Sequence, residues 1–600
     1  MASTGDAFLD EQIALVGADR GRLMDVLRAV QTRYGHVSDA SASAIAAGLG
    51  MHVGDVIDAL SFYAFFSRVP AGRFQIRLSR TPISRIHGAD AVAHAFCQAL
   101  GIAMGETSPD GLVTLNWTSD IGMADQEPAA LVNDVVVTAL TPEVVPAILA
   151  ALRAAIDAST GIPSPGNRVP LPHARVHPNV VQAGPLLSRA ARRGDGIRAA
   201  LLLPPEQVVA RIAAARLRGR GGAGFPTALK WRLCRNGPDG ERHIICNADE
   251  GEPGTFKDRV LLSDFADLVF DGMTIAGYAL GAPSGVMYLR AEYAWMLPAL
   301  HDVLAARRRL GLLGGAICGH DAFGFEIRIQ SGAGAYICGE ESALIESLEG
   351  KRGAPRDRPP FPTEHGYRDR PTAVNNVETL ACVARIMENG PEMFAALGTR
   401  ESTGTKLMSL SGDCPHPGLY EVPFGITLNG LLDLAGAPDA GFVQVGGPSG
   451  RSVAPKDFGR RLAYEDLSTG GSIMIFGPDR DVLDIVLQFA EFFADESCGW
   501  CTPCRVGTAL LRDQMAHVAA GRATLRDIGA LESLAGTVAR TSRCGLGQTA
   551  PNPILSTMRD FPERYEARLQ AADFVSKIDL IAAQRESAAL QGRRPVEELF

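Results

Sequence analysis

Four cysteines near the C-terminal end of the chain have the spacing of ligands to an iron–sulfur cluster. Cys498, Cys501 and Cys504 are separated by two residues each, and Cys544 follows forty positions later. Three thiolates at this spacing can lie on one tight turn and bind three corners of a cube, while the distant fourth cysteine binds the last corner. The pattern therefore predicts a [4Fe–4S] cluster. A structural zinc site is the alternative, although zinc sites with four cysteines usually combine two Cys-x-x-Cys pairs, and a third interpretation is four unligated core cysteines.

A glycine-rich segment over residues 219–226 could bring the backbone close to a bound nucleotide. Glycine has no β-carbon, so backbone N–H groups in such a segment can approach a phosphate or a ring. The preceding residues are alanine-rich and helical, whereas an ordinary dinucleotide-binding turn requires a strand at that place. Lys230 follows the segment and could add an ammonium group beside a helix N-terminus. The alternative is a glycine turn with a structural role only.

An acidic loop over residues 247–259 follows a predicted strand over 243–246. Ligands of α/β proteins collect at the carboxyl ends of strands. Asp249, Glu250 and Glu252 fall within four positions and repel one another unless they accept hydrogen bonds, which the hydroxyl groups of a sugar or a ribityl chain would donate. The alternative is a solvated acidic loop.

A second glycine-rich segment, residues 332–341, follows another predicted strand over 326–330. It repeats the combination of close backbone approach and carboxylates. Residues further along the chain could supply cations for a pyrophosphate, an aromatic face for a base or a nicotinamide, and amides for the edge of a flavin. They are Arg356, Arg358, Phe361, Asn375 and Asn376.

Nucleotide-binding loops and an iron–sulfur site in one chain require a carrier between them. A nicotinamide gives a hydride, whereas a cluster accepts one electron at a time, and a flavin converts between the two. The sequence therefore predicts FMN together with NAD(H). Because the cofactors carry the chemistry, we expect no catalytic acid–base residue.

These motifs fall in different parts of a multidomain α/β chain of 600 residues. A chain of this length is expected to form several domains. Changes of hydrophobic periodicity predict a helical unit over 1–70, a thioredoxin-like domain over 71–157, a proline-rich linker over 158–195, a Rossmann-like FMN- and NAD(H)-binding domain over 196–400, a β-grasp domain over 401–480 and a helical bundle carrying the [4Fe–4S] cluster over 481–600.

The composition excludes several classes of protein. Hydrophobic residues make up 46% and charged residues 21%, which is typical of a globular protein and excludes wholesale disorder. With 58 basic and 67 acidic residues, the chain has a net charge of −9, which disfavours a nucleic-acid partner. There is no apolar run of about 18 residues and no secretory signal at the start, so we expect a cytoplasmic protein without a membrane span. Eleven cysteines are too sparse for a disulfide scaffold and indicate a reducing compartment.

The two glycine-rich segments, the acidic loop and the four cysteines together resemble the FMN- and NADH-binding flavoprotein subunit of respiratory complex I and its diaphorase relatives. The resemblance extends from about Pro204 to Arg568. It implies that FMN is held by Gly219, Arg220, Gly221, Gly222, Lys230, Asn247, Asp249, Glu250, Gly339, Glu340, Asn375 and Asn376. It implies that NADH lies near Phe225 and Phe361 with Glu252 and Glu341 as contacts, and Tyr336 and Arg358 complete the predicted cofactor-binding set.

The first 150 or so residues resemble a second complex I subunit, the thioredoxin-like one, fused to the same chain. In that family a Cys-x₄-Cys pair and a Cys-x₃-Cys pair hold a [2Fe–2S] cluster. Here Ser79, Ser84, Asp120 and Ala124 stand at the equivalent positions. We therefore expect no [2Fe–2S] cluster in this chain and a structural role for the N-terminal module.

The fusion most resembles the diaphorase flavoprotein subunit of NAD-reducing soluble [NiFe] hydrogenases. The resemblance implies an NADH:acceptor oxidoreductase that exchanges electrons between NAD(H) and a partner through FMN and one [4Fe–4S] cluster, for H₂:NAD⁺ oxidoreduction. The implied partners are a small iron–sulfur diaphorase subunit and [NiFe] hydrogenase subunits in a hetero-oligomer. The alternatives are the diaphorase subunit of an NAD-dependent formate dehydrogenase, a redox-inert assembly scaffold and a zinc-containing binding module.

Overall fold

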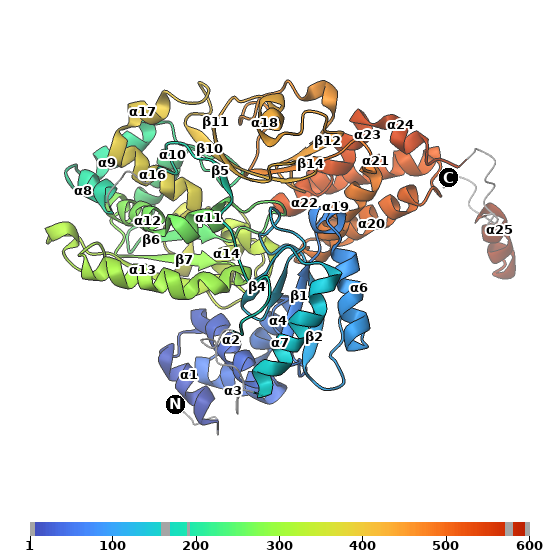
Figure 1. Ribbon diagram of the computed structural model, residues 1–600, viewed down its shortest axis with the longest axis horizontal. Coiled ribbons are helices and arrows are strands. Elements are labelled where there is room, and N and C mark those ends of the chain that lie inside the picture. The colour runs from blue at the N-terminus through green and yellow to red at the C-terminus, as the bar shows by residue number, and fades with distance from the viewer. Residues whose placement is uncertain (1–5, 158–168, 189–192, 571–579, 594–600) are drawn as a thin grey trace.

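Three sheets and the helices around them make up most of the chain (Figure 1). The computed structural model describes residues 6–157, 169–188, 193–570 and 580–593. It confirms the predicted mixed α/β fold with a thioredoxin-like domain near the N-terminus and a helical region at the C-terminal end. None of the helices in these ranges is long and apolar enough to cross a membrane.

A four-stranded parallel sheet lies at the centre of the region over residues 196–400. Its order is β8 (Glu326–Ser331), β7 (Ser284–Leu289), β6 (His243–Ala248) and β9 (Thr372–Asn376). The surrounding helices are α8 (Asp195–Leu201), α9 (Pro205–Ala214), α10 (Thr227–Arg235), α11 (Lys257–Asp264), α12 (Ala266–Leu280), α13 (Leu297–Arg309), α14 (Glu341–Leu348), α15 (Pro362–His365), α16 (Val377–Asn389) and α17 (Pro391–Ala395).

Both faces of this parallel sheet are covered, as its nearly continuous apolar strands require. Successive residues of β6 point to opposite faces. Ile244 packs in one core with Phe270 of α12 and Leu380 of α16, and Ile245 packs in another core with Leu23. The carboxyl ends of β6 and β9 are adjacent, because Asn247 pairs with Asn376.

The N-terminal helical unit supplies the second of these cores. Its helices are α1 (Ala7–Leu15), α2 (Leu23–Tyr34), α3 (Asp39–Leu49) and α4 (Val53–Phe62). Apolar residues of α2 and α4 share one buried cluster with Ile337, Leu344 and three of the four spaced cysteines, Cys498, Cys504 and Cys544. The helical unit is therefore continuous in its packing with the region that carries the predicted cofactor residues.

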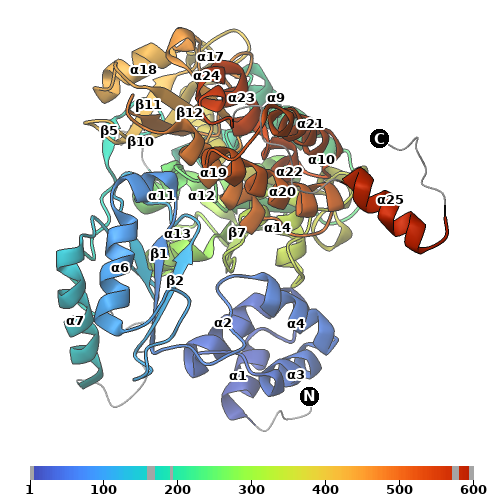
Figure 2. The same cartoon turned by 90° about the vertical axis from the view of Figure 1, so that its right-hand side faces the viewer.

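The thioredoxin-like domain has a four-stranded mixed sheet of order β2-β1-β3-β4. Its elements are β1 (Phe74–Ser79), α5 (Pro82–Ile86), α6 (Ala89–Leu100), β2 (Val113–Thr118), β3 (Ala130–Val132), β4 (Val135–Val137) and α7 (Val145–Asp157). Figure 2 shows this domain and the helical unit side by side, below the other sheets.

A six-stranded sheet of order β13-β12-β14-β10-β11-β5 covers the region predicted as β-grasp. Its elements are β10 (Thr405–Gly412), β11 (Gly418–Pro423), α18 (Leu428–Ala435), β12 (Phe442–Val445), β13 (Arg451–Val453) and β14 (Ser472–Phe476). The edge strand β5 (Val180–Gln182) comes from the segment expected to be an extended linker and pairs in parallel with β11. Residues 158–168 and 189–192 of that expected linker lie outside the described residues.

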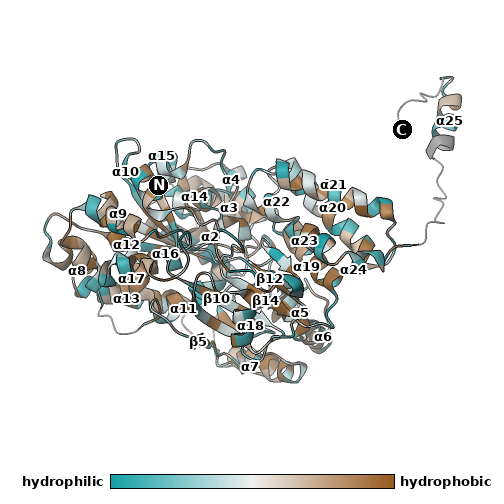
Figure 3. Ribbon diagram, turned by 90° about the horizontal axis from the view of Figure 1, so that it is seen from above, coloured by the Kyte–Doolittle hydropathy of each residue, from teal (hydrophilic) through white to brown (hydrophobic). Residues whose placement is uncertain are grey.

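The C-terminal helices are α19 (Val482–Asp495), α20 (Thr502–Ala519), α21 (Leu525–Thr541), α22 (Gly545–Thr549), α23 (Asn552–Asp560), α24 (Pro562–Glu566) and α25 (Leu580–Leu590). Helix α20 packs against both α19 and α21, and Figure 3 shows that these helices carry both hydrophobic and hydrophilic residues. A capping box in which Thr524 and Asp527 exchange hydrogen bonds begins α21. Cys504 lies in the first turn of α20 and Cys501 directly precedes that helix, whereas Cys544 directly precedes α22.

Candidate functional site

A cavity of about 660 Å³ lies between the carboxyl ends of β6 and β9 and the six-stranded sheet. Its volume is within the range of small-molecule and cofactor sites. We call it the nucleotide cavity, because residues predicted to bind FMN or NAD(H) line it. Ten of the predicted cofactor residues line it. They are Gly221, Gly222, Asn247, Asp249, Glu250, Glu252, Tyr336, Gly339, Glu340 and Asn376.

The first glycine-rich segment forms one wall of this cavity through its backbone. Gly222 has φ +135°, a conformation that residues with a side chain rarely adopt. A β-carbon on Gly221 would lie 3.1 Å from the Cβ of Asn376. The Arg220 backbone N–H donates to the Thr379 hydroxyl at 2.8 Å, which fixes the segment to α16. This wall therefore offers exposed backbone rather than side chains.

Asn247 joins the acidic loop to the second glycine-rich segment. Its side-chain amide donates to the Gly339 carbonyl at 2.8 Å, and its Oδ1 accepts from the Asp249 N–H at 3.1 Å. Burial raises the pKa of the Asp249 carboxyl well above its ordinary value. Two loops about ninety residues apart in the sequence thus meet at one asparagine, at the end of β6.

The Glu250 carboxylate faces the cavity but is held by protein donors. It accepts from the N–H groups of Asp258 and Arg259 at 2.8 and 3.1 Å, and from the Tyr293 hydroxyl at 2.8 Å. Burial, together with the nearby Asp258 carboxylate, raises the pKa of Glu250 to about 7. Glu250 therefore stabilises the first turn of α11 and fixes the shape of the acidic loop.

Glu340 and Glu252 are also held by the protein. Glu340 caps α14 by accepting from the N–H groups of Ser342 and Ala343 at 3.1 and 3.0 Å. Glu252 accepts from the Tyr336 hydroxyl at 2.5 Å and from the Ser449 N–H at 2.8 Å. Glu252 thereby links the second glycine-rich segment to the six-stranded sheet.

The other eight predicted cofactor residues do not line the nucleotide cavity. They are Gly219, Arg220, Phe225, Lys230, Glu341, Arg358, Phe361 and Asn375. The Arg220 guanidinium is fully buried, donates to the Thr403 carbonyl at 2.6 Å and lies over the Phe424 ring. The planar donors of this side chain are therefore turned into the protein core, and the predicted contact of Arg220 with a cofactor stays a prediction.

Lys230, Glu341 and Arg358 form an ion-pair network beside the cavity. Lys230 lies 2.9 Å from Glu341, and Arg358 lies 3.2 Å from Glu341 and 3.1 Å from Glu340. Phe225 and Phe361 are 43% and 50% exposed, so both rings are open to a further ligand. Their contact with NAD(H) remains a prediction.

Asn375, predicted as an amide for the flavin edge, does not line the nucleotide cavity. It is buried, and its side-chain oxygen accepts from the Trp231 indole N–H at 2.9 Å. Because Asn375 and Asn376 are consecutive residues of β9, their side chains point to opposite faces. Only Asn376 reaches the cavity.

Several lining residues were missed by the sequence analysis. Lys257 is buried and lies 2.6 Å from Asp258 and 3.2 Å from Glu378. It belongs to the acidic loop, so a basic residue among acids could have marked it as a site residue in the sequence. Most of the others come from later domains, where no local pattern marks them. They include Ser449, Arg451, Tyr464, Ser468, Thr469, Gly470, Thr549 and Asn552.

All four spaced cysteines border a single small cavity. Cys498, Cys501, Cys504 and Cys544 line it together with Ile337, Pro355, Trp500, Arg543 and Leu546. Cys501 precedes the first turn of α20, and Cys544 precedes α22. Burial raises the pKa of the Cys504 and Cys544 thiols to about 11, so ligation requires that the metal displace their protons.

The donor set fits a cubane cluster. Four sulfur donors, three from one turn and one from a second helix start, are the ligands that a [4Fe–4S] cluster requires. Arg543 makes an ion pair with Asp357 and lies over the Trp500 ring, so a cation borders this cavity. In the part of the chain that the structure describes, no group of three or more His, Cys, Asp or Glu side chains is placed to hold a metal ion. The fit therefore rests on donor chemistry and on the shared cavity.

The nucleotide cavity and the cysteine cavity are neighbours. Ile337 and Leu546 border both. Gly545, which follows Cys544 directly, borders the nucleotide cavity. The two cavities thus share part of their walls.

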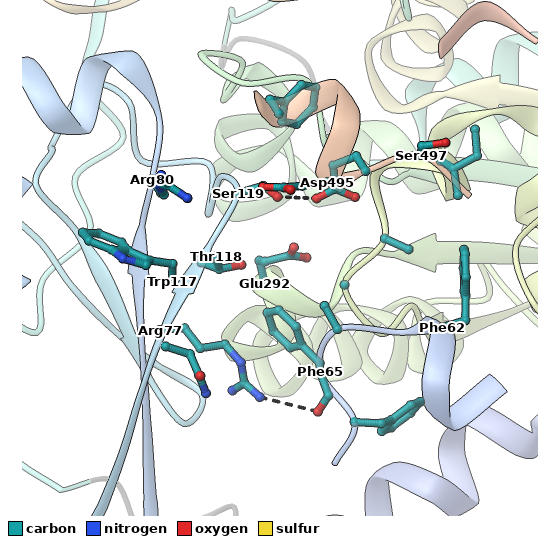
Figure 4. A pocket seen from close by; sticks show the side chains of 18 of the residues that line it. Phe62, Phe65, Arg77, Arg80, Trp117, Thr118, Ser119, Glu292, Asp495 and Ser497 are labelled. Atoms are coloured by element: carbon teal, nitrogen blue, oxygen red, sulfur yellow. Dashed lines mark hydrogen bonds between the residues drawn. The ribbon is translucent and has the colours of Figure 1, made fainter. Parts of the chain in front are cut away.

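A third cavity of about 750 Å³ lies on the other side of Cys498, between the thioredoxin-like domain and α19. Figure 4 shows Arg77, Arg80 and Trp117 along one side of it and Glu292 and Asp495 on the other. Its walls therefore carry charges of opposite sign.

Comparison with known proteins assigns the chain to a family. The NAD-reducing hydrogenase HoxS subunit alpha of Cupriavidus necator is 50% identical over 562 residues, which cover 92% of each chain. This chain belongs to that subunit family. The NADP-reducing hydrogenase subunit HndC of Solidesulfovibrio fructosivorans is 43% identical over 391 residues, covering 63% of this chain and 79% of that subunit. A crystal structure of NAD⁺-reducing [NiFe]-hydrogenase in the H₂-reduced state contains a chain with a TM-score of 0.85 and 39% identity, and the match covers 96% of this chain and 98% of that one.

Three family models match successive parts of this family member. They are the thioredoxin-like [2Fe-2S] ferredoxin over residues 9–153, the Nuo51 FMN-binding domain over 212–385 and the NADH-ubiquinone oxidoreductase-F iron-sulfur binding region over 484–568. The FMN-binding domain and the iron–sulfur region confirm those two predictions.

The match over residues 9–153 contradicts the expectation that this chain has no [2Fe–2S] centre, and that expectation is withdrawn. It was drawn from four positions alone, whereas the match extends over the whole thioredoxin-like domain. At those positions Ser79 donates to Glu127 at 2.7 Å, Ser84 exchanges hydrogen bonds with Thr81 at the start of α5, and Asp120 is buried.

Proposed function

We propose that this chain is the diaphorase subunit of an NAD-dependent hydrogenase, an NADH:acceptor oxidoreductase that exchanges electrons between NAD(H) and partner subunits. The observation that carries the proposal is the adjacency of the nucleotide cavity and the cysteine cavity through Ile337 and Leu546. When bound, FMN supplies the conversion between hydride transfer and single-electron transfer, and a [4Fe–4S] cluster supplies the one-electron carrier.

The residues of this chain bind and orient these groups rather than react. The backbone at Gly221 and Gly222 leaves room for a ring or a phosphate, and Asn247 and Asn376 offer amides at the ends of two adjacent strands. Cys498, Cys501, Cys504 and Cys544 would hold the cluster. The exposed rings of Phe225 and Phe361 are available to stack on the nicotinamide or the adenine of NAD(H).

The partners in this proposal are a small iron–sulfur diaphorase subunit and [NiFe] hydrogenase subunits in a cytoplasmic hetero-oligomer. The overall reaction is H₂ + NAD⁺ ⇌ NADH + H⁺, in which two electrons and one proton pass to NAD⁺ and the second proton is released. Binding of hydrogen belongs to the partner subunits in this scheme.

Native purification under anaerobic conditions tests the proposal. We expect the chain to co-purify with FMN, iron, acid-labile sulfide and nickel-containing subunits, and we expect the complex to form NADH from NAD⁺ under H₂. Molybdenum in place of nickel, with NADH formation driven by formate, would instead assign the chain to a formate dehydrogenase. A colourless protein that lacks NADH-dependent dye reduction after reconstitution with FMN and iron would contradict any diaphorase role.

A further inference from the structure

We propose that the turn over residues 119–125 of the thioredoxin-like domain is a positioning element for the nucleotide cavity, with Asp120 and Asp125 as its positioning residues. The inference deepens the proposed function, because it concerns how FMN and NAD(H) are held. The turn follows β2, and its side chains reach the acidic loop, the start of α11 and the segment before Cys498.

Asp120 reaches the acidic loop directly. It is 1% exposed, and its Oδ2 accepts from the Gly254 N–H at 3.1 Å. The Arg290 guanidinium donates to the backbone carbonyls of both Asp120 and Glu250, and lies 3.8 Å from the Asp120 carboxylate. The loop residue Glu250, which lines the cavity, is thus tied to the turn through one buried arginine.

Gly254 packs closely against the six-stranded sheet at this contact. It has φ +82°, and a β-carbon there would lie 2.5 Å from the Ser472 hydroxyl of the six-stranded sheet. The acidic loop is therefore held between Asp120 on one side and β14 on the other.

Asp125 fixes the opposite end of the loop. Its two carboxylate oxygens accept from the two terminal nitrogens of Arg259, both at 2.9 Å. Arg259 also donates to the Gly122 carbonyl at 2.7 Å, and its side chain and that of Asp125 are almost completely buried. Bidentate arginine–carboxylate pairs fix orientation as well as distance. Since the Arg259 backbone N–H donates to Glu250, this pair sets the direction from which α11 leaves the cavity.

Ser119 extends the same turn to the second glycine-rich segment. Its hydroxyl donates to Glu496, and Glu496 accepts from the Tyr336 N–H at 3.1 Å (Figure 4 shows Ser119 beside α19). Tyr336 lines the nucleotide cavity, and Glu496 stands two residues before Cys498. One turn of the thioredoxin-like domain thus contacts both loops of the nucleotide cavity and the approach to the cysteine cavity.

These contacts differ from general packing between domains, because most of them end on residues that line the cavity or on their nearest neighbours. Buried, fully paired polar networks hold one geometry. We therefore expect substitutions in the turn to change FMN affinity, the FMN midpoint potential and the KM for NADH while the protein still folds.

The test uses the full-length protein with the variants Asp120→Asn and Asp125→Asn, and Asp134→Asn as the control. Asp134 is exposed on the same domain. We measure the FMN dissociation constant by flavin fluorescence, the FMN midpoint potential, and KM and kcat for NADH. We expect both variants to weaken FMN binding by about tenfold or more, to shift the potential and to raise KM, while iron content and the control remain unchanged.

Two further variants keep the test decisive if Asp125→Asn does not fold. Ser119→Ala removes one hydroxyl and is expected to raise the KM for NADH through Tyr336. The double variant Asp125→Asn with Arg259→Gln removes the buried charge on both sides and is expected to recover part of the FMN affinity lost in Asp125→Asn. Wild-type values for FMN affinity, potential and KM in folded Asp120→Asn and Ser119→Ala would overturn the positioning role. Absence of FMN from the wild type would instead overturn the proposed function.

Discussion

Carboxylates around the nucleotide cavity are held by donors of the protein itself. Glu250 accepts three hydrogen bonds, Glu340 caps α14, and Glu252 binds Tyr336 and Ser449. All three were predicted to contact a cofactor: Glu250 and Glu252 as members of an acidic loop that requires donors, and Glu340 as a carboxylate of the second glycine-rich segment. The donors in the structure come from helix N-termini and from a later domain, so the side chains shape the cavity wall.

Glu250→Gln tests the buried charge of this wall. The pKa of Glu250 is about 7 in the folded protein against 4.5 as its ordinary value. Between these two pH values the folded state binds more protons than the unfolded state, so this residue makes the protein less stable as pH rises from 4.5 to 7. The wild type therefore loses about 3 kcal/mol of its free energy of unfolding by pH above 7 through this residue, and Glu250→Gln does not.

Denaturant unfolding of wild type and Glu250→Gln between pH 4.5 and 7.5 measures this difference. Asp258, Lys257, Arg259 and Tyr293 surround the same carboxyl and remain in both proteins. The Glu563→Gln variant, which changes an exposed glutamate in the same way, serves as the control. Parallel curves for wild type and Glu250→Gln would contradict the assigned charge state.

Asn376→Ala tests whether one amide serves both the fold and the cavity. Asn376 caps α16 by accepting from the Glu378 N–H at 3.0 Å, and it donates to Asp258 at 2.6 Å. Loss of the cap is expected to cost about 1–2 kcal/mol, and loss of the wall contact is expected to weaken FMN binding. Ser38→Ala removes the cap of α3 far from the cavity. Both variants should lower Tm, and an unchanged FMN affinity in Asn376→Ala would rule out its cavity role.

At the scale of elements, the N-terminal helical unit holds the second glycine-rich segment. The Ala64 N–H donates to the Gly334 carbonyl at 3.2 Å, and the Phe65 N–H donates to the Ala333 carbonyl at 3.1 Å. The Gln330 side-chain amide donates to the Gly21 carbonyl at 2.9 Å. A segment that lines the nucleotide cavity is thus supported from behind by the first helices of the chain.

Gly334→Ala tests this support. Gly334 has φ +77°, and a β-carbon there would lie 2.3 Å from a ring carbon of Phe65. We expect a loss of about 1–3 kcal/mol in stability. Gly529 lies exposed within α21 with no atom within 4 Å of its added β-carbon, so Gly529→Ala is expected to gain about 0.5–1 kcal/mol. Thermal unfolding compares the two, and a Gly334→Ala protein as stable as wild type would contradict the contact.

Site residues were predictable where neighbouring residues in the sequence form a recognisable pattern. The cysteine spacing predicted the four sulfurs that border one cavity, and the position of Asn247 and Asp249 after a predicted strand pointed to two residues that line the other. The direction of Arg220 was not predictable, since its partners Thr403 and Phe424 lie about two hundred residues later. The pairing of β5 with β11 depends on a similarly distant strand, so no signal in the proline-rich segment marked it.

At the scale of the whole molecule, the chain brings a nucleotide cavity and a cysteine cavity into contact. Parts of the flavin domain, the six-stranded sheet and the C-terminal helices all line the nucleotide cavity, and the N-terminal units hold two of its loops from outside. In the thioredoxin-like domain, a comparison of four ligand positions led to the expectation of no [2Fe–2S] cluster. The family match over residues 9–153 contradicts that expectation.

Anaerobic reduction by NADH of wild type and Cys544→Ser tests whether electrons leave the flavin through the four-cysteine site. Cys318→Ser, which changes an exposed free cysteine, is the control. Flavin absorbance follows the first step, and low-temperature electron paramagnetic resonance follows the cubane cluster. We expect that NADH still bleaches the flavin of Cys544→Ser, whereas the cubane signal and electron delivery to the partner are lost. A Cys544→Ser protein that keeps the cubane signal, or one that remains folded but whose flavin is no longer reduced, would contradict this expectation.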